Sequence, residues 1–197
     1  MKKLLITAFV PFGKQTHNSS LEVVRKLRKQ FKGIELVFVK LPVVFNIDLY
    51  GDLLKQHQPD YLLMCGQAGG RKLIECEKVA INYVYSRQPD NIGVIIKGSR
   101  IIYDGPDAYF STAPLLPIVN KLQEEKLPVQ MSFSAGTYVC NFSYYLMLHT
   151  IHIHHLCCEA MFVHFPYFAG QTADNFPSLG LKEMVNTLKR LIEIWLF

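Results

Sequence analysis

The sequence predicts an α/β fold: a three-layer α/β/α sandwich with a mostly parallel, mixed sheet and a hairpin excursion. Three observations lead to this prediction. Short apolar runs with the period of strands alternate along the chain with segments that have the period of amphipathic helices. Two runs, 61–65 and 160–163, are continuously apolar, as expected for central strands of a parallel sheet. At 197 residues, 50% of them hydrophobic, the chain has the size of a single domain, residues 1–197.

The first half of the chain contains three predicted strands and two predicted helices. The strands are Leu4–Phe9, Glu35–Val39 and Tyr61–Cys65, and the helices are Ser20–Phe31 and Ile47–His57. Ser19 and Glu22 form a capping box for the first helix, and Gly33 follows its end. Each helix lies between two strands, which is the arrangement that crossover connections of a parallel sheet require.

From 72 to 102 the pattern changes to extended segments. Residues 74–85 are predicted to be extended, and 93–102 are predicted to form a hairpin that turns at Lys97-Gly98-Ser99. The alternation then resumes with a helix at 115–125, a strand at 129–133, a helix at 141–151, a strand at 160–163 and a last helix from about Ser178. Because sites in such sheets gather at the carboxyl ends of strands, we expect the loops after Phe9, Cys65, Phe133 and Val163 to share one edge.

Composition argues against several classes of protein. The formal charge of +5 is mild, and no basic run is interleaved with aromatic residues, so nucleic-acid binding is not expected. No apolar run approaches about 18 residues, so no membrane-spanning helix is expected. Residues 1–10 imitate a signal peptide, but Pro11 and Gly13 follow at once, and a buried first strand is the preferred interpretation. The five cysteines form no disulfide framework, which predicts a cytoplasmic location.

A cysteine and a histidine are the strongest candidates for chemistry. The block 134–141 follows a predicted strand, turns on Gly136 and enters a predicted helix, so Cys140 lies near a helix N-terminus. The partial positive charge there favours a thiolate. His164 follows the strand 160–163. A nucleophile and a base at the ends of separate strands are typical of a cysteine hydrolase.

The residue that would orient the imidazole is left open by the pattern. Glu75 and Glu77 lie two apart on an extended segment and point to the same face, so spacing does not choose between them. Both also fit an edge strand that carries charge for solubility. Arg87, in a turn, is a candidate for placing positive charge beside a developing oxyanion, although an arginine in a turn needs no such role. The loop 66–71 is rich in glycine but lacks the end of a Walker motif, and its amides suit a small ligand's carbonyl.

Two further groups of residues bear on ligands. Histidines and cysteines gather at His149, His152, His154, His155, Cys157 and Cys158, but their spacing fits no standard zinc site, so no metal is predicted. Phe9 and Phe12 flank Pro11 after the first strand, where they are candidates for the walls of a small apolar pocket.

Five blocks of sequence together carry a resemblance to a known family. They are Thr7–Gly13 with Asn18, Gly66–Arg71 followed by Glu77–Asn82, Arg87-x-Pro89-Asp90-Asn91, Ser134–Asn141, and Val163–Pro166 with Gln171. In these blocks the chain resembles the type I pyroglutamyl peptidases (pyrrolidone carboxyl peptidases), which are cysteine peptidases that remove an N-terminal pyroglutamate. The resemblance covers the chain from about Leu4 to Gln171.

The resemblance implies an omega-peptidase with assigned residues. It implies that Cys140 is the nucleophile, His164 the general base, Glu77 rather than Glu75 the third triad member, and Arg87 a neighbour of the oxyanion. The pyroglutamate pocket would be built from Phe9, Phe12, Asn18, Gln67, Tyr138 and Val139. It further implies a cytoplasmic enzyme without cofactor, often a homotetramer, that acts on peptides with N-terminal pyroglutamate.

The chain departs from the family at several positions, and two rival functions are considered beside the peptidase. Ala8 and Lys14 stand where the family commonly has glycine, and Tyr138 where it commonly has phenylalanine, which bears on pocket affinity more than on the reaction. The first rival is a binding protein on the same fold that holds cyclic amides or peptide N-termini without turnover. The second, a nucleoside phosphorylase-like enzyme, rests on sandwich architecture alone and would not need Cys140 and His164.

Overall fold

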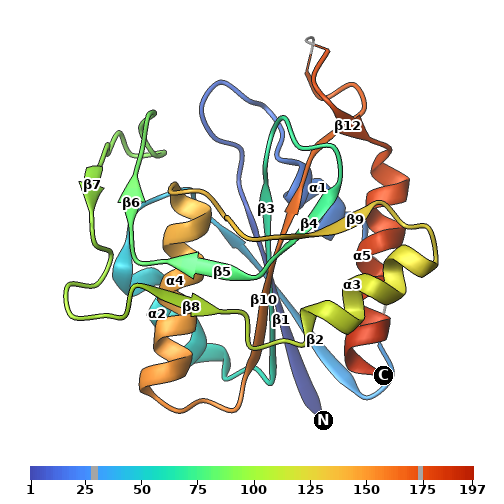
Figure 1. Cartoon of the computed structure of the whole chain (residues 1–197), viewed down its shortest axis with the longest axis horizontal. Coiled ribbons are helices and arrows are strands. Elements are labelled where there is room, and N and C mark those ends of the chain that lie inside the picture. Colours follow the sequence, from blue (N-terminus) through green and yellow to red (C-terminus); the bar gives the residue numbers. More distant parts are fainter. Residues whose placement is uncertain (28–30, 173–174) are drawn as a thin grey trace.

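A mixed sheet runs through the centre of the molecule (Figure 1). The computed structural model describes residues 1–27, 31–172 and 175–197, and within these ranges six strands form this sheet in the order β2-β1-β3-β10-β4-β9. Their bounds are β1 Lys2–Phe9, β2 Ile34–Leu41, β3 Tyr61–Gln67, β4 Ile74–Glu77, β9 Val129–Ser132 and β10 Glu159–Phe165. Strands β2, β1, β3 and β10 are parallel, β4 pairs antiparallel with β10, and β9 is parallel to β4. The predicted α/β class with a mostly parallel sheet is confirmed.

Helices cover both faces of the sheet. Helices α1 (Ser19–Lys26), α3 (Leu115–Glu124) and α5 (Leu181–Leu196) pack on one face, and α2 (Ile47–His57) and α4 (Val139–Ile153) on the other (Figure 1). Successive residues of β1 alternate between the two cores, as the pleat of a strand requires. None of the helices in the described ranges is both long and apolar enough to cross a bilayer.

Strand parity places the candidate catalytic side chains on the face that α4 covers. Phe162 of β10 belongs to the core beneath α2 and α4, so His164, two residues later, points to the same side. Cys76 of β4 belongs to the core beneath α1, α3 and α5, so Glu75 and Glu77 point to the α4 side. The pleat of β4 and β10 alone therefore brings His164, Glu75 and Glu77 to one face of the sheet.

The excursion between β4 and α3 forms two short antiparallel pairs. Strand β5 (Val79–Ile81) pairs with β8 (Ala108–Phe110), and β6 (Val84–Tyr85) pairs with β7 (Lys97–Ser99). The hairpin predicted within 93–102 is therefore wrong, because its supposed turn is itself strand β7. The turn lies within 86–96 instead, where the Asp90 carboxylate accepts hydrogen bonds from the Ile92 and Val94 amides. Gly98 suggests a turn when only the sequence is read. In the structure it has a positive φ, which is accommodated where the register between β6 and β7 is irregular.

Several predicted boundaries also differ. The N-cap of α1 is Asn18 rather than Ser19, since the Asn18 side chain accepts a hydrogen bond from the Ser20 amide. The predicted continuation of this helix over 28–30 lies outside the described residues. Helix α4 begins two residues earlier than predicted, at Val139. The last helix begins at Leu181, because 178–179 form β12, which pairs with β11 (Tyr167–Phe168).

The direction of β9 corrects the prediction of a single shared edge. Strands β1, β3 and β10 are parallel, so their carboxyl ends meet at one edge. Strand β9 runs the opposite way, because it is parallel to β4 and β4 is antiparallel to β10. The loop 133–138 therefore has to cross toward that edge before α4 begins (Figure 1). Cys140 reaches the edge through this loop and not because its strand ends there.

Asn82 connects the end of β5 to residues 101–105 of the excursion by hydrogen bonds, so its loss should destabilise the fold. Its buried carboxamide accepts from the Ile101 and Ile102 amides at 2.8 and 2.9 Å and donates to the Ile102 and Gly105 carbonyls at 2.8 and 3.2 Å. Asn82→Ala removes the acceptor of the Ile101 and Ile102 amides, so we expect the free energy of unfolding to fall by about 3 kcal/mol in urea denaturation. Asn120→Ala, at an exposed position of α3, is the control and should change it by less than about 0.5 kcal/mol. Equal effects would contradict the assignment.

Candidate active site

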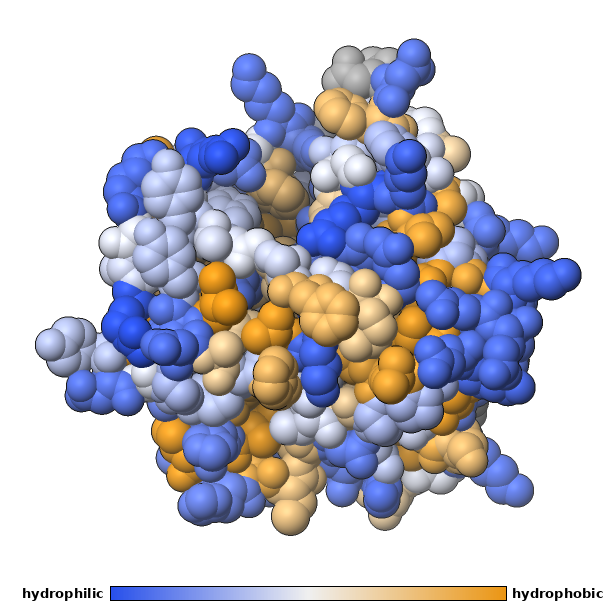
Figure 2. Space-filling view, viewed as in Figure 1, coloured by the Kyte–Doolittle hydropathy of each residue, from blue (hydrophilic) through white to orange (hydrophobic). Residues whose placement is uncertain are grey.

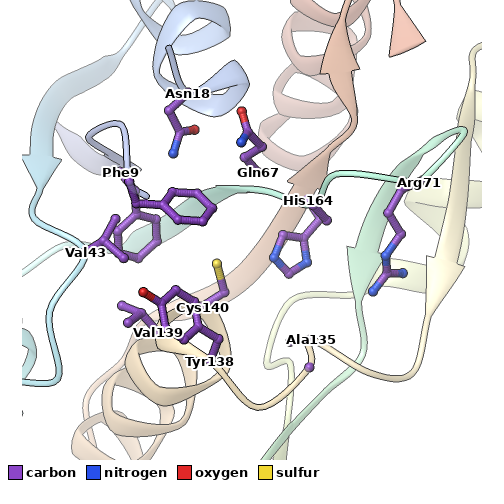
Figure 3. A pocket seen from close by; sticks show the side chains of 13 residues that line it. Phe9, Asn18, Val43, Gln67, Arg71, Ala135, Tyr138, Val139, Cys140 and His164 are labelled. Carbon is purple, nitrogen blue, oxygen red and sulfur yellow. The ribbon is translucent and has the colours of Figure 1, made fainter. Parts of the chain in front are cut away.

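A cavity of about 200 Å³ opens where β1, β3 and β10 end, between the N-termini of α1 and α4 (Figure 3). This is less than the roughly 300–1,000 Å³ typical of drug-sized ligands, so it suits a group of the size of one amino acid. Its apolar walls are Phe9, Phe12, Val43, Ala68, Ala135, Tyr138 and Val139. Gly136 and the polar residues Asn18, Gln67, Arg71, Cys140 and His164 complete the lining.

Cys140 is the second residue of α4, so its sulfur lies at the positive end of the helix dipole. Figure 3 shows the sulfur pointing into the cavity. The floor beneath it is Gly66 of β3: a methyl group there would lie 3.0 Å from Cys140 Sγ and 2.8 Å from the Phe162 ring. A side chain at position 66 would therefore displace the sulfur or the ring.

His164 is buried between Glu77 and Cys140. Its Nδ1 lies 2.7 Å from Glu77 Oε1, a hydrogen bond that fixes the ring and places the proton on Nδ1 when the imidazole is neutral. Burial lowers the pKa of His164, but the charge on Cys140 and the hydrogen bonds with Cys140 and Glu77 outweigh it and raise this pKa to about 9. Burial raises the pKa of Glu77, yet the hydrogen bond and charge of His164 hold it below its usual value. Glu77 and His164 thus stabilise each other's ionised forms.

The structure separates the two glutamates that spacing leaves equivalent. In the pairing of β4 with β10, His164 lies opposite Glu75, but its ring reaches diagonally to Glu77. Glu75 pairs with the Arg71 guanidinium and accepts a hydrogen bond from Gln130 Nε2 at 2.8 Å. Glu77 is therefore the carboxylate in contact with the imidazole.

The residues expected to form the pocket all line the cavity: Phe9, Phe12, Asn18, Gln67, Tyr138 and Val139. The orientation of Gln67 is set by its neighbours, because its Oε1 accepts from Ser19 N at 2.7 Å and from Gln171 Nε2 at 2.6 Å. Its Nε2 donates to Gln15 Oε1 at 2.6 Å, which leaves one N–H for a ligand. In Figure 3 this nitrogen lies on the cavity side.

Asn18 joins α1 to the end of β1. Its Oδ1 accepts from Ser20 N, and its Nδ2 donates to the Val10 carbonyl at 3.1 Å. The side chain is 1% exposed and lines the cavity, so this wall is fixed by the cap of α1. Tyr138 is fixed on the opposite side, where its hydroxyl donates to the Pro89 carbonyl at 2.8 Å.

Arg87 is placed beside the cavity and not in its lining. It is exposed and lines an adjoining hollow that shares Phe12 and Tyr138 with the cavity. Sequence reasoning missed other members of the lining, above all Val43 and Arg71. Signals for both exist: Val43 follows β2, the neighbour of β1, and Arg71 ends the glycine-rich block.

The remaining cysteines and histidines lie apart from this site. All five cysteines are free thiols, and Cys65 and Cys76 face the core on the far side of the sheet. Burial raises the pKa of the Cys76 thiol to about 12. Within the described residues, no three histidine, cysteine or acidic side chains converge as metal ligands. His149 instead contacts the Tyr109 hydroxyl at 2.9 Å.

Comparison with known proteins gives a consistent result. The sequence model of one family, described as Pyroglutamyl peptidase, matches residues 2–196. The pyrrolidone-carboxylate peptidase of Thermococcus onnurineus is 41% identical over 194 residues, with 97% of each chain covered. That of Enterococcus faecalis is 36% identical, covering 97% of this chain and 92% of the relative.

Solved structures agree with these relatives. A mutant pyrrolidone carboxyl peptidase of Pyrococcus furiosus superposes with a TM-score of 0.93 at 32% identity, covering 98% of both chains. Pyroglutamyl peptidase I of Bacillus amyloliquefaciens superposes with a TM-score of 0.92 at 38% identity, covering 98% of this chain and 94% of that one.

The titration of His164 should depend on Cys140. Because the pKa in the folded state, about 9, exceeds the ordinary value of 6.5, the contribution of His164 to stability is complete below about pH 6.5 and lost as pH rises through 9. We expect NMR titration to find a lower imidazole pKa in Cys140→Ser, because serine does not supply the charge of Cys140 that raises the pKa of His164 against the effect of burial. Cys157→Ser, at an exposed thiol, should leave it unchanged. An unaltered His164 titration in Cys140→Ser would contradict the coupling.

Proposed function

Because this chain belongs to the pyroglutamyl peptidase family, we propose that it is a cysteine peptidase that hydrolyses the bond after an N-terminal pyroglutamyl residue through a thioester on Cys140. The observation that carries the proposal is the hydrogen-bonded Glu77–His164 pair beside Cys140, in a cavity of single-residue size. The proposed steps need a nucleophile and a proton carrier, which these side chains supply, and call for no cofactor.

The proposed reaction has two halves. His164 takes the proton of the Cys140 thiol, and Sγ attacks the carbonyl carbon of the scissile peptide bond. As the tetrahedral intermediate collapses, the C–N bond breaks and His164 gives this proton to the leaving amine. Water then attacks the thioester while His164 takes a proton from it, and the C–S bond breaks to release pyroglutamate. Glu77 holds the imidazole in orientation through both halves. Backbone amides at the start of α4 stabilise the oxyanion, and Arg87 adds its positive charge from the adjoining hollow.

The proposed specificity follows from what the cavity lacks. Among its lining residues there is no carboxylate, and one of them, Arg71, is a cation. A peptide with an ordinary N-terminal ammonium would bury that charge without a partner, at a cost of several kcal/mol. A lactam ring is neutral, and its carbonyl suits the spare N–H of Gln67.

Location and assembly are part of the same proposal. Five free cysteines suit a reducing compartment, so we place the enzyme in the cytoplasm.

Large apolar side chains are exposed at the face formed by β8, the end of β9 and α3, with Phe110 65%, Phe133 72% and Leu116 61% exposed (Figure 2). Such a face suits contact with a second copy, which supports a homo-oligomer, the family resemblance suggesting a tetramer.

Cys140→Ser should abolish turnover without unfolding the chain. On a pyroglutamyl amide with a fluorescent leaving group, we expect kcat/KM to fall by about a thousandfold or more, because an alcohol beside this base is a far weaker nucleophile. The residues have similar size, so the free energy of unfolding should change by less than about 0.5 kcal/mol. Cys157→Ser is the matched control. Tight binding of the amide by the wild type without turnover would favour the binding-protein rival.

Glu77→Gln should cost far more activity than Glu75→Gln. A glutamine at 77 no longer holds the imidazole in one tautomer, and we expect kcat to fall roughly 100- to 10,000-fold. The hydrogen bond of His164 goes to Glu77 and not to Glu75, so the loss for Glu75→Gln should be at least about ten times smaller. The measurement is steady-state kinetics on one pyroglutamyl amide, with folding checked by circular dichroism. The reverse order would show that the wrong glutamate has been assigned.

A further inference from the structure

Arg71 lines the cavity, takes no part in the proposed steps, and is surrounded by acceptors from three segments. Its guanidinium pairs with Glu75 of β4 and donates to Ser132 Oγ of β9 at 3.3 Å. It also donates to the Ser134 carbonyl in the loop 133–138 at 3.0 Å, and Nη2 lies 3.8 Å from Glu77 Oε1. One side chain thus joins the triad carboxylate to the segment that leads to the nucleophile.

Glu75 keeps this arginine in place. The Glu75 side chain is 6% exposed, and such a buried carboxylate needs a compensating charge. Gln130 Nε2 binds its other oxygen at 2.8 Å, so the carboxylate has a fixed position. A planar guanidinium held on one edge by a fixed carboxylate directs its other N–H groups in fixed directions. Arg71 is therefore oriented, with its free edge toward the loop and Glu77.

Resting on the function proposed above, we propose that Arg71 is a positioning residue of the reaction, which holds Glu77 against His164 and the loop 133–138 beneath Cys140. The loop is fastened on its other side as well, since Thr137 Oγ1 donates to the Tyr85 carbonyl at 2.9 Å. Between these two attachments the chain turns at Gly136 into α4. Releasing the Arg71 side would let the nucleophile shift against its base.

The groups that face Glu77 define what removal of Arg71 does to its ionisation. They are His164 from β10, Arg71 from the loop after β3, Glu75 from β4, and Tyr144 from α4, whose hydroxyl donates to the Glu77 carbonyl at 3.1 Å. Cys76 is the neighbour of Glu77 in β4 but points to the other face of the sheet. Burial raises the pKa of Glu77, and His164, Ser132 and Arg71 lower it. Without the arginine this pKa rises, so the acidic limb of the activity profile moves to higher pH.

The test compares Arg71→Met and Arg71→Lys with wild type on one pyroglutamyl amide. We expect Arg71→Met to lower kcat roughly 10- to 100-fold with little change in KM, because misplacement and not binding is affected. Its acidic limb should lie at higher pH than that of the wild type. Arg71→Lys should restore the acidic limb and part of kcat, since lysine keeps the charge but not the planar donor set. The control is Arg190→Met, which breaks a surface pair with Glu125 far from the cavity and should leave both parameters unchanged.

A double variant distinguishes an Arg71 that positions Glu77 and the loop 133–138 from an Arg71 that only balances the charge of Glu75. Arg71→Met combined with Glu75→Gln buries no unpaired carboxylate at position 75, so it also serves if the single variant does not fold. Activity that stays at least tenfold below Glu75→Gln supports the proposal. Recovery to the level of Glu75→Gln overturns it, and so does a loss in Arg71→Met that appears only in KM. Wild-type enzyme without turnover would instead refute the proposed function itself.

Discussion

The antiparallel pairing of β4 with β10 is the contact on which the arrangement of the site depends. In an otherwise parallel run of strands, this reversal sets a strand with two inward glutamates directly beside the strand that carries His164. The diagonal reach from His164 to Glu77 follows from the register of that pair. The same reversal turns β9 around and forces the loop 133–138 to cross the sheet toward Cys140. One pairing therefore fixes both the position of Glu77 beside His164 and the path of the loop that leads to Cys140.

The site tolerates several buried ionisable groups because their charges alternate in space. Glu75, Arg71, Glu77 and His164 follow one another, each next to a group of the opposite sign when the imidazole is protonated. Burying any one alone would cost several kcal/mol, and removing one member leaves its neighbours unpaired. Because these side chains are in contact, the free-energy changes caused by single substitutions among them will not add up to the change caused by a double substitution.

The sequence was sufficient for the parts of the fold that local periodicity determines. Helix α2 spans Ile47–His57 as predicted, and the strand pattern places His164 at the end of a buried strand. The direction of β4 is not contained in that pattern, because a strand of four residues has the same composition in either orientation. The choice of Asn18 as the N-cap of α1 was equally hidden, since Asn18, Ser19 and Ser20 are all good caps. Glu77 could be preferred to Glu75 only by resemblance, since pairing register is a tertiary property.

The division of the molecule by its sheet also sorts the thiols for chemical labelling. Cys65 and Cys76 are fully buried on the far side of the sheet, and Cys158 is buried as well. A bulky alkylating reagent therefore meets two sulfurs in the folded chain, the half-buried Cys140 in the cavity and the exposed Cys157. Replacing Cys157 leaves a single addressable thiol, so that one spectroscopic reporter can be attached inside the pocket of an otherwise unmodified chain.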